Sequence, residues 1–149
     1  MKKIIVDSNI LFSAILNVNS RIGQMLINGD RFFDFYSPKY ARTEIFDHQD
    51  KIKEIADLTT EEFLETYELI TKNVTILNHS ILPEKHLKKA FDYCHDIDID
   101  DTIFVGFSEY LKTKLWTGDK KLIKGLQSKG FKRIITTEEL YEEFINLFM

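Results

Sequence analysis

Four acidic residues stand beside apolar segments of the sequence, where a charged side chain needs a reason: Asp7, Glu44, Asp101 and Asp119. Asp7 and Asp119 each follow a short strand-like run. Asp101 opens a helical pattern, and Glu44 lies within another. Two carboxylates about 4 Å apart repel by about 4 kcal/mol at an effective dielectric constant of about 20, so a cluster of them needs a cation. Carboxylate oxygens favour the hard ions Mg²⁺ or Mn²⁺.

The segments around these acids alternate between strand and helix. Apolar, mostly β-branched runs predict strands over residues 4–6, 33–36, 74–77, 115–116 and 133–135. Apolar residues at helical spacing predict helices over residues 10–15 (capped by Ser8 or Asn9), 21–27, 38–46, 84–94, 101–111, 120–126 and 137–147, with two short antiparallel helices within 47–72. This alternation predicts an α/β sandwich with a central parallel sheet. The acids then lie at the carboxyl edge of the sheet, where ligands bind, and can meet in space.

Composition narrows the classes of protein to consider. With 149 residues, 44% of them hydrophobic, we expect one globular domain over residues 1–149. The formal net charge of −4 counts against a protein that coats duplex DNA, so nucleic-acid binding would need a local basic patch. The single cysteine, Cys94, excludes an intrachain disulfide and is expected to be buried. The apolar run at residues 4–6 is too short for a signal peptide or a membrane span, which predicts a cytoplasmic protein with no membrane partner.

Four stretches, taken together, resemble a PIN domain: residues 6–11, 41–45, 98–104 and 115–122, the last reading Leu-Trp-Thr-Gly-Asp-Lys-Lys-Leu. The resemblance spans almost the whole chain and is to the toxin-type, VapC-like ribonucleases of that family. It implies a three-layer α/β/α sandwich and a metal-dependent endoribonuclease that hydrolyses RNA phosphodiester bonds. Asp7, Glu44, Asp101 and Asp119 match the family's catalytic acids and would be the ligands of Mg²⁺ or Mn²⁺.

Further residues near these acids have expected supporting roles. Asp98 matches an additional acid found in part of the family, and Asn9 and Thr117 are expected to orient a carboxylate or a water. The helix N-termini at Asp101 and Asp119 are expected to help keep these two acids ionised. The candidates for contact with RNA phosphates are Lys120, Lys121 and Arg42, with Lys124 and Arg21 as weaker ones. Trp116 is expected to pack in the core rather than to stack on a base.

The resemblance also implies partners beyond an RNA substrate. Many small members that consist of this domain alone are toxins of toxin–antitoxin pairs, which implies an antitoxin protein and a homodimer. Two other functions remain open. One is a PIN-like module that binds RNA or protein without cutting; the other is a haloacid dehalogenase-like phosphatase, whose nucleophile signature Asp98-x-Asp100-x-Thr102 matches. That signature should follow a strand, whereas the residues before it have a helical pattern.

Overall fold

A wholly parallel five-stranded sheet forms the centre of the molecule. The computed structural model describes residues 1–148. The strands are β1 (Lys2–Val6), β2 (Phe33–Pro38), β3 (Val74–Leu77), β4 (Lys114–Trp116) and β5 (Ile134–Ile135). Their order in the sheet is β3-β2-β1-β4-β5, with β1 in the middle. The predicted strands therefore exist, and the strand preceding the first acid is the central one.

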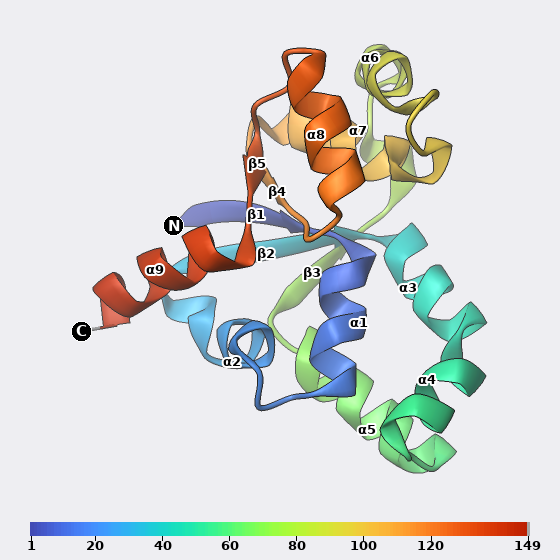
Figure 1. Cartoon of the computed structure of the whole chain (residues 1–149), viewed down its shortest axis with the longest axis vertical. Helices are drawn as coiled ribbons and strands as arrows, with labels where there is room; N and C mark the ends of the chain where they lie inside the picture. Colours follow the sequence, from blue (N-terminus) through green and yellow to red (C-terminus); the bar gives the residue numbers. More distant parts are fainter. Residues whose placement is uncertain (149) are drawn as a thin grey trace.

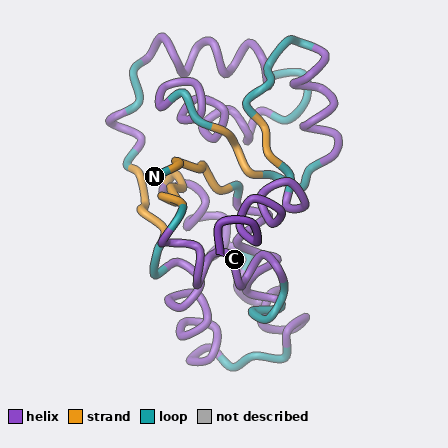
Figure 2. The backbone as a smooth tube through the Cα atoms, turned by 90° about the vertical axis from the view of Figure 1, so that its left-hand side faces the viewer, coloured by secondary structure: helices purple, strands orange, loops and turns teal. Residues whose placement is uncertain are grey.

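Helices cover both faces of this sheet (Figures 1 and 2). One face carries α6 (Glu84–Cys94), α7 (Thr102–Leu111) and α8 (Lys120–Ser128). The other carries α1 (Ser8–Leu16), α2 (Arg21–Asn28), α5 (Thr60–Thr71) and α9 (Thr137–Phe148), with α3 (Lys39–Asp47) and α4 (Gln49–Ala56) packed beside α1. Short 3₁₀ turns are η1 (Gly29–Arg31), η2 (His79–Ile81) and η3 (Ile99–Asp101). The three-layer α/β/α architecture is confirmed.

The core explains why the strands are continuously apolar. Ile4, Ile5 and Val6 are fully buried because helices pack on both sides of β1. Trp116 is also fully buried, its ring lies 5.9 Å from that of Phe35, and its Nε1 donates to Thr137 Oγ1 at 3.0 Å. The prediction that Trp116 packs in the core is confirmed, and so is the burial of Cys94.

The start of α1 differs from the prediction. Residues 8 and 9 do not cap α1: its N-cap is Asp7, whose N–H donates to Trp116 O at 3.0 Å and continues the pairing between β1 and β4. Ser8 is therefore already inside the helix, and it is buried. In the charged segment 47–72, α4 has no side-chain cap, whereas the N-cap of α5, Thr59, forms a reciprocal capping box with Glu62.

Within residues 1–148, no single helix is long and apolar enough to span a membrane. Helix α1 reaches that length and apolar character only together with α2 and η1, across a bend of 105°. Ile10, Leu11, Met25 and Leu26 of this pair are buried in the core.

Candidate active site

Asp7 lies at the carboxyl end of the central strand and is 1% exposed. Its Oδ2 accepts a hydrogen bond from Thr117 Oγ1 at 2.7 Å, and its Oδ1 accepts one from Ser8 Oγ at 3.4 Å. Although it is the N-cap of α1, its side chain makes no capping hydrogen bond. The Asp7 carboxylate is thus held at the edge of the sheet by the hydroxyls of Thr117 and of Ser8, the first residue of α1.

Thr117 joins Asp7 to the start of α8. Its fully buried hydroxyl donates to Asp7 and accepts from the Asp119 N–H at 3.1 Å. Asp119, half-buried, is the N-cap of α8 and accepts from the Leu122 N–H through Oδ1 at 3.1 Å. Oδ1 of Asp119 therefore caps the helix, and Oδ2 takes no part in the cap. The contact expected of Thr117 with a site carboxylate is present.

Glu44 and Asp101 supply two buried oxygens that lack a partner. Oε1 of Glu44, on α3, and Oδ2 of Asp101, the N-cap of α7, make no hydrogen bond with any described residue. Asp101 is 9% exposed, and its side chain does not cap α7. An unpaired buried carboxylate oxygen is costly and is rare in folded proteins. These two oxygens are suited to accept a ligand.

The carboxylates affect one another electrostatically. Burial raises the pKa of Asp101 to about 8, and the charges of Asp7, Asp98, Asp119 and Glu44 contribute to that rise. Burial is also the main cause that raises the pKa values of Asp7 and Glu44. The charge of Asp119 raises the pKa of Asp7 further. The pKa of Asp101 therefore rises although the residue is the N-cap of α7, and the favourable effect expected of that helix N-terminus stays a prediction.

The residue types at this edge fit a hard divalent cation. A cation among these acids would offset their mutual repulsion and would accept the unpaired oxygens of Glu44 and Asp101. No three His, Cys, Asp or Glu side chains among the described residues lie close enough together to hold one metal ion. Asp7 and Asp119 instead direct oxygens at Thr117 and at the α8 N-terminus. The fold brings the four acids to one region without holding three of them at ligand distance.

The other candidates from the sequence lie at different distances from this centre. Asp98 is exposed and accepts from the Asp100 N–H at 3.0 Å, so it stabilises the η3 turn. Asn9 is exposed and lines the same hollow as Glu44. Lys120 and Lys121 lie in the first turn of α8, next to Asp119, and are exposed. Arg42 lies over the Phe46 ring, 5.7 Å from its centre, in a hollow that none of the four acids lines.

Two contributors were not expected from the sequence. Ser8, 5% exposed, hydrogen-bonds to Asp7 and lowers the pKa of Glu44, so it lies between two of the acids. Tyr40 lies close enough to Glu44 and Asp100 for their charges to raise its pKa, after burial as the main cause. The position of Ser8 directly after Asp7 was the one feature of the sequence that could have indicated its role. Nothing in the sequence pairs Tyr40 with the loop before α7, because only the packing of α3 against that loop brings them together.

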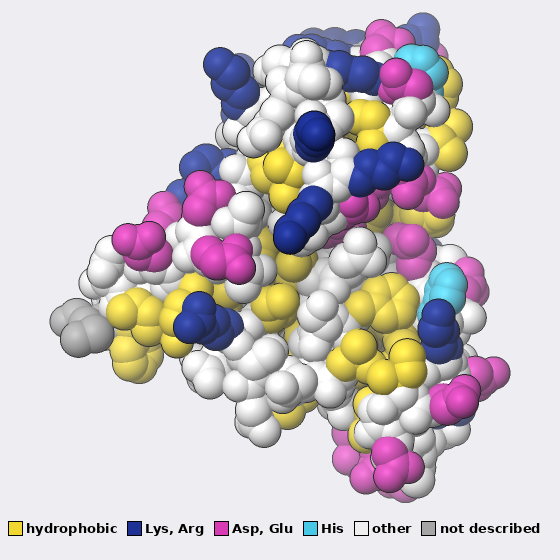
Figure 3. All heavy atoms as spheres, in the orientation of Figure 1, with side chains coloured by type: hydrophobic (Ala, Val, Ile, Leu, Met, Phe, Trp, Pro, Cys, Tyr) yellow, Lys and Arg dark blue, Asp and Glu magenta, His cyan; other side chains and the backbone are white. Residues whose placement is uncertain are grey.

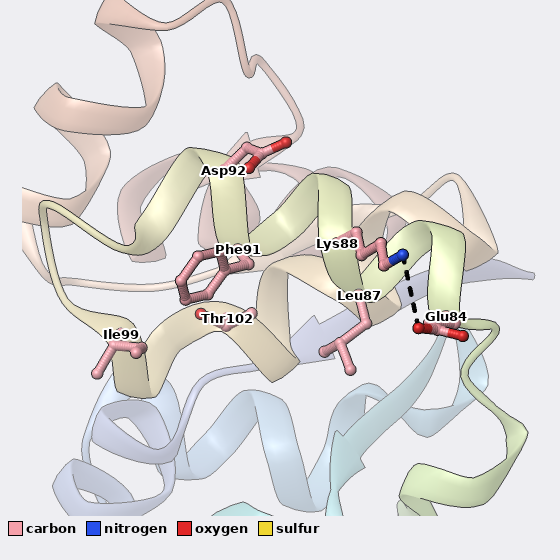
Figure 4. Close-up of a pocket in the computed structure, with 7 residues that line it drawn as sticks. All are labelled: Glu84, Leu87, Lys88, Phe91, Asp92, Ile99 and Thr102. Atoms are coloured by element: carbon pink, nitrogen blue, oxygen red, sulfur yellow. Dashed lines mark ion pairs between the residues drawn. The ribbon is translucent and has the colours of Figure 1, made fainter.

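Among the hollows near this edge, two are described by their lining residues. One of 490 Å³ lies between α6 and the η3–α7 turn and is lined by Leu87, Phe91 and Ile99, with Glu84, Lys88 and Asp92 at its rim (Figure 4). None of the four acids lines it. A second, of 350 Å³, runs between α1 and α4 and has Glu44 and Asn9 among its lining residues. The second hollow therefore includes one of the four acids in its lining.

The phosphatase signature has the wrong structural context here. Asp98 and Asp100 follow helix α6 and lie in and before η3, whereas that signature belongs directly after a strand. The acid that follows the central strand is Asp7.

Comparison with known proteins agrees with this architecture. The family model described as PIN domain matches residues 5–143. Among solved structures, the chain is similar to one in the crystal structure of VapBC2 from Rickettsia felis bound to a DNA fragment from their promoter, with a TM-score of 0.66 and 12% sequence identity. The similarity covers 90% of this chain and 96% of that chain. No curated protein matches the chain.

Proposed function

Because the chain belongs to the PIN domain family, we propose that it is a metal-dependent endoribonuclease that hydrolyses RNA phosphodiester bonds. The observation that carries this proposal is the convergence of Asp7, Glu44, Asp101 and Asp119 at the carboxyl edge of the sheet, with two buried oxygens left unpaired. A purely structural domain has no reason to gather carboxylates that repel one another. In this proposal the four acids are the ligands of Mg²⁺ or Mn²⁺.

Each side chain has a distinct task in the proposed reaction. A divalent ion bound here would neutralise phosphate oxygens and lower the pKa of a water that attacks in line. Asp7 and Asp101 are the first-choice ligands, and Glu44 and Asp119 bind directly or through water. Thr117 is a positioning residue, since its hydroxyl fixes Asp7 and the Asp119 backbone relative to each other. Asp98 and Asn9 are auxiliary and act at the rim.

Cations near the acids are suited to hold RNA phosphates. Figure 3 shows Lys and Arg side chains over the α8 part of the molecule and acidic side chains where this part meets the α1 part. Lys120 and Lys121 belong to α8 and are exposed. We assign them to phosphate binding, and Arg42 to a more distant contact because its guanidinium packs on Phe46.

The test is cleavage of a mixed RNA pool by the purified protein with Mn²⁺ or Mg²⁺, with EDTA as the metal-free control. Asp7→Asn should abolish cleavage because the metal loses a charged ligand. The fold should be retained, because the substitution also removes the repulsion between Asp7 and the other acids. Asp100→Asn, at an exposed acid of the η3 turn, is the matched control and should cut as the wild type does. Unchanged cleavage by Asp7→Asn would refute the site. No cleavage by well-folded wild-type protein would favour the non-catalytic binding module, and dependence on Asp100 instead of Asp7 would favour the phosphatase.

An antitoxin is the proposed protein partner. The hollow between α1 and α4 has apolar walls from Phe12, Leu16, Ile52 and Ile55, of which Leu16 is 41% and Ile55 61% exposed. Its lining includes Glu44, so a partner segment seated there would cover part of the acid site. The test is whether the product of a short gene adjacent to this one co-purifies with the protein and inhibits cleavage. Co-purification that survives Leu16→Glu with Ile55→Glu would refute this surface.

A second copy of the chain is the proposed occupant of the hollow beside α6. Its apolar floor, Leu87, Phe91 and Ile99, is 38% to 57% exposed. Its rim carries charges of both signs, Glu84 and Lys88 among them, which form an ion pair at 3.6 Å. A surface that combines both signs around an apolar centre can match itself across a two-fold axis. The hollow beside α6 is therefore suited to a symmetric homodimer.

A further inference from the structure

A hollow at the edge of the sheet opposite the acids is lined mainly by cations. Its volume is 460 Å³, and its lining consists of Met1, Lys2, Lys3, Leu111, Lys112, Thr113, Lys114, Lys132 and Arg133. Six of these nine residues are Lys or Arg, and none is Asp or Glu. The whole chain has a net charge of −4, so this concentration of one sign is local and opposite to that of the molecule.

These cations have little compensation within the protein. Lys2 forms an ion pair with Glu143 at 2.7 Å. Among residues 1–148, the other five cations of the hollow have no carboxylate within ion-pair distance. Five uncompensated like charges around one hollow repel one another, and an anion would relieve that repulsion.

The backbone beneath the hollow is well fixed. Lys114 belongs to β4 and pairs in register with Ile4 of β1. The Thr113 N–H donates to Ser108 O at 3.1 Å, and the Thr113 hydroxyl donates to Lys3 O. The Arg133 carbonyl accepts from the Leu115 N–H at 2.8 Å. The backbone that carries these cations therefore belongs to three adjacent strands or to the two residues before a strand.

The hollow cannot belong to the acid site. Its lining residues belong to or precede the amino ends of β1, β4 and β5. The N-terminus lies on the left in Figure 1, and Figure 3, in the same orientation, shows Lys and Arg side chains on that side of the molecule. Asp7 and Asp119 follow the carboxyl ends of β1 and β4. The path along β1 from Lys2 to Asp7 is about 16 Å at the usual rise per residue. A ligand at the hollow is thus separate from the reacting phosphate.

We propose that this hollow, hereafter the amino-edge basic hollow, binds the phosphate backbone of the RNA substrate at a distance from the cleavage site. The inference rests on the proposed nuclease function for the identity of the polyanion. Several cations around one hollow suit neighbouring phosphates of one strand, whose binding releases counterions and is strongly salt-dependent. Flexible Lys side chains contact the backbone without reading bases, so the hollow adds affinity and no sequence preference.

The test measures binding without cleavage. A fluorescein-labelled single-stranded RNA of about 16 nucleotides is titrated with protein in EDTA, and anisotropy is followed at several salt concentrations. The variant Lys114→Gln with Lys132→Gln is compared with a matched control, Lys72→Gln with Lys85→Gln. Both variants lose the same two charges from exposed positions, and neither control residue forms an ion pair among the described residues.

The basic-hollow variant should bind several-fold more weakly. Its salt slope should be shallower by about 1.4, because each phosphate of a single strand that the protein neutralises contributes about 0.7 to the slope. The control should match the wild type. Equal affinity and slope for the two variants would overturn the proposal. Tighter binding of tripolyphosphate than of RNA by the wild-type protein would also overturn the proposal, since a compact polyphosphate would then be the ligand.

The same variants separate this proposal from the nuclease function. Lys114→Gln with Lys132→Gln should leave kcat unchanged and raise KM for the long RNA, because neither residue is near the acids. If the basic-hollow variant and the control bind RNA equally while the wild type cleaves RNA, only the basic hollow is refuted. Absence of metal-dependent cleavage, with the binding difference intact, refutes only the nuclease.

Discussion

Asp101 carries an electrostatic cost that the sequence alone does not reveal. The residue is 9% exposed, and its burial, together with the charges of four other acids, raises its pKa from 3.8 to about 8. Between these two values the folded protein holds a proton that the unfolded chain has released. The free energy of unfolding must therefore fall as the pH rises through this window.

Asp101→Asn should remove this penalty. In EDTA, the variant should be more stable than the wild type at pH 8, by on the order of a few kcal/mol, and the difference should vanish near pH 4. Thermal unfolding across this pH range measures it, with Asp100→Asn as a control expected to run parallel to the wild type. Mn²⁺ should raise the melting temperature of the wild type and not that of Asp101→Asn. Parallel stability curves for Asp101→Asn and the wild type would contradict the prediction.

At the scale of elements, the start of each helix decides how an acid can be used. Asp119 caps α8 with one oxygen, whereas Asp7 and Asp101 stand at helix N-caps without side-chain capping bonds. These two acids therefore contribute little to their helices through their side chains. Asp119 contributes both a cap and a charge, and the two contributions can be separated.

Two substitutions of Asp119 should separate them. Asn is a good N-cap and Ala is not, so Asp119→Ala should lower the free energy of unfolding by about 1 kcal/mol while Asp119→Asn should nearly preserve it. Both variants should lose most of the metal-dependent cleavage, because both lack the carboxylate. Urea denaturation and cleavage rates measure the two effects. If Asp119→Asn cuts at the wild-type rate, Asp119 acts only as a helix cap.

At the scale of the whole molecule, charge and apolar surface are unevenly distributed. The acids gather at the carboxyl edge of the sheet, and cations gather at the amino edge despite the net charge of −4. The apolar hollow beside α6 lies on the layer formed by α6, α7 and α8. A homodimer through this layer would leave the amino-edge basic hollow, lined by other residues, available to RNA.

Phe91→Glu should convert the proposed dimer to a monomer. Phe91 is 44% exposed in the α6 hollow, and Leu69 on α5 is equally exposed on the other layer, so Leu69→Glu is the matched control. Burying a charge in an apolar interface is costly, whereas a charge on a free surface is not. Sedimentation velocity of the two variants and the wild type measures the effect. A wild type that is monomeric at all concentrations, or a Phe91→Glu variant that remains dimeric, would refute this interface.

Much of the fold could be predicted because it depends on local sequence. Residues 4–6 and 74–77 are apolar runs, and strands buried on both faces need such runs. Residues 84–94 follow a proline and have a helical pattern, and the observed helix has these bounds. The order of acids along the chain was sufficient for the resemblance to the PIN domain, which the family match confirms. The extent of the domain over residues 1–149 and the roles of the four acids stay predictions.

Details of the site depended on which elements pack together. The sequence cannot place the Thr117 hydroxyl on Asp7, since 110 residues separate them. Nor can it show that Arg42 turns onto Phe46 instead of toward Glu44, because a helix position allows several rotamers. The sequence by itself determined the parallel α/β architecture and the edge at which the acids lie. Only the tertiary structure decided which carboxylate oxygens are hydrogen-bonded and which remain unpaired, because desolvation and hydrogen bonding depend on contacts between segments far apart in the chain.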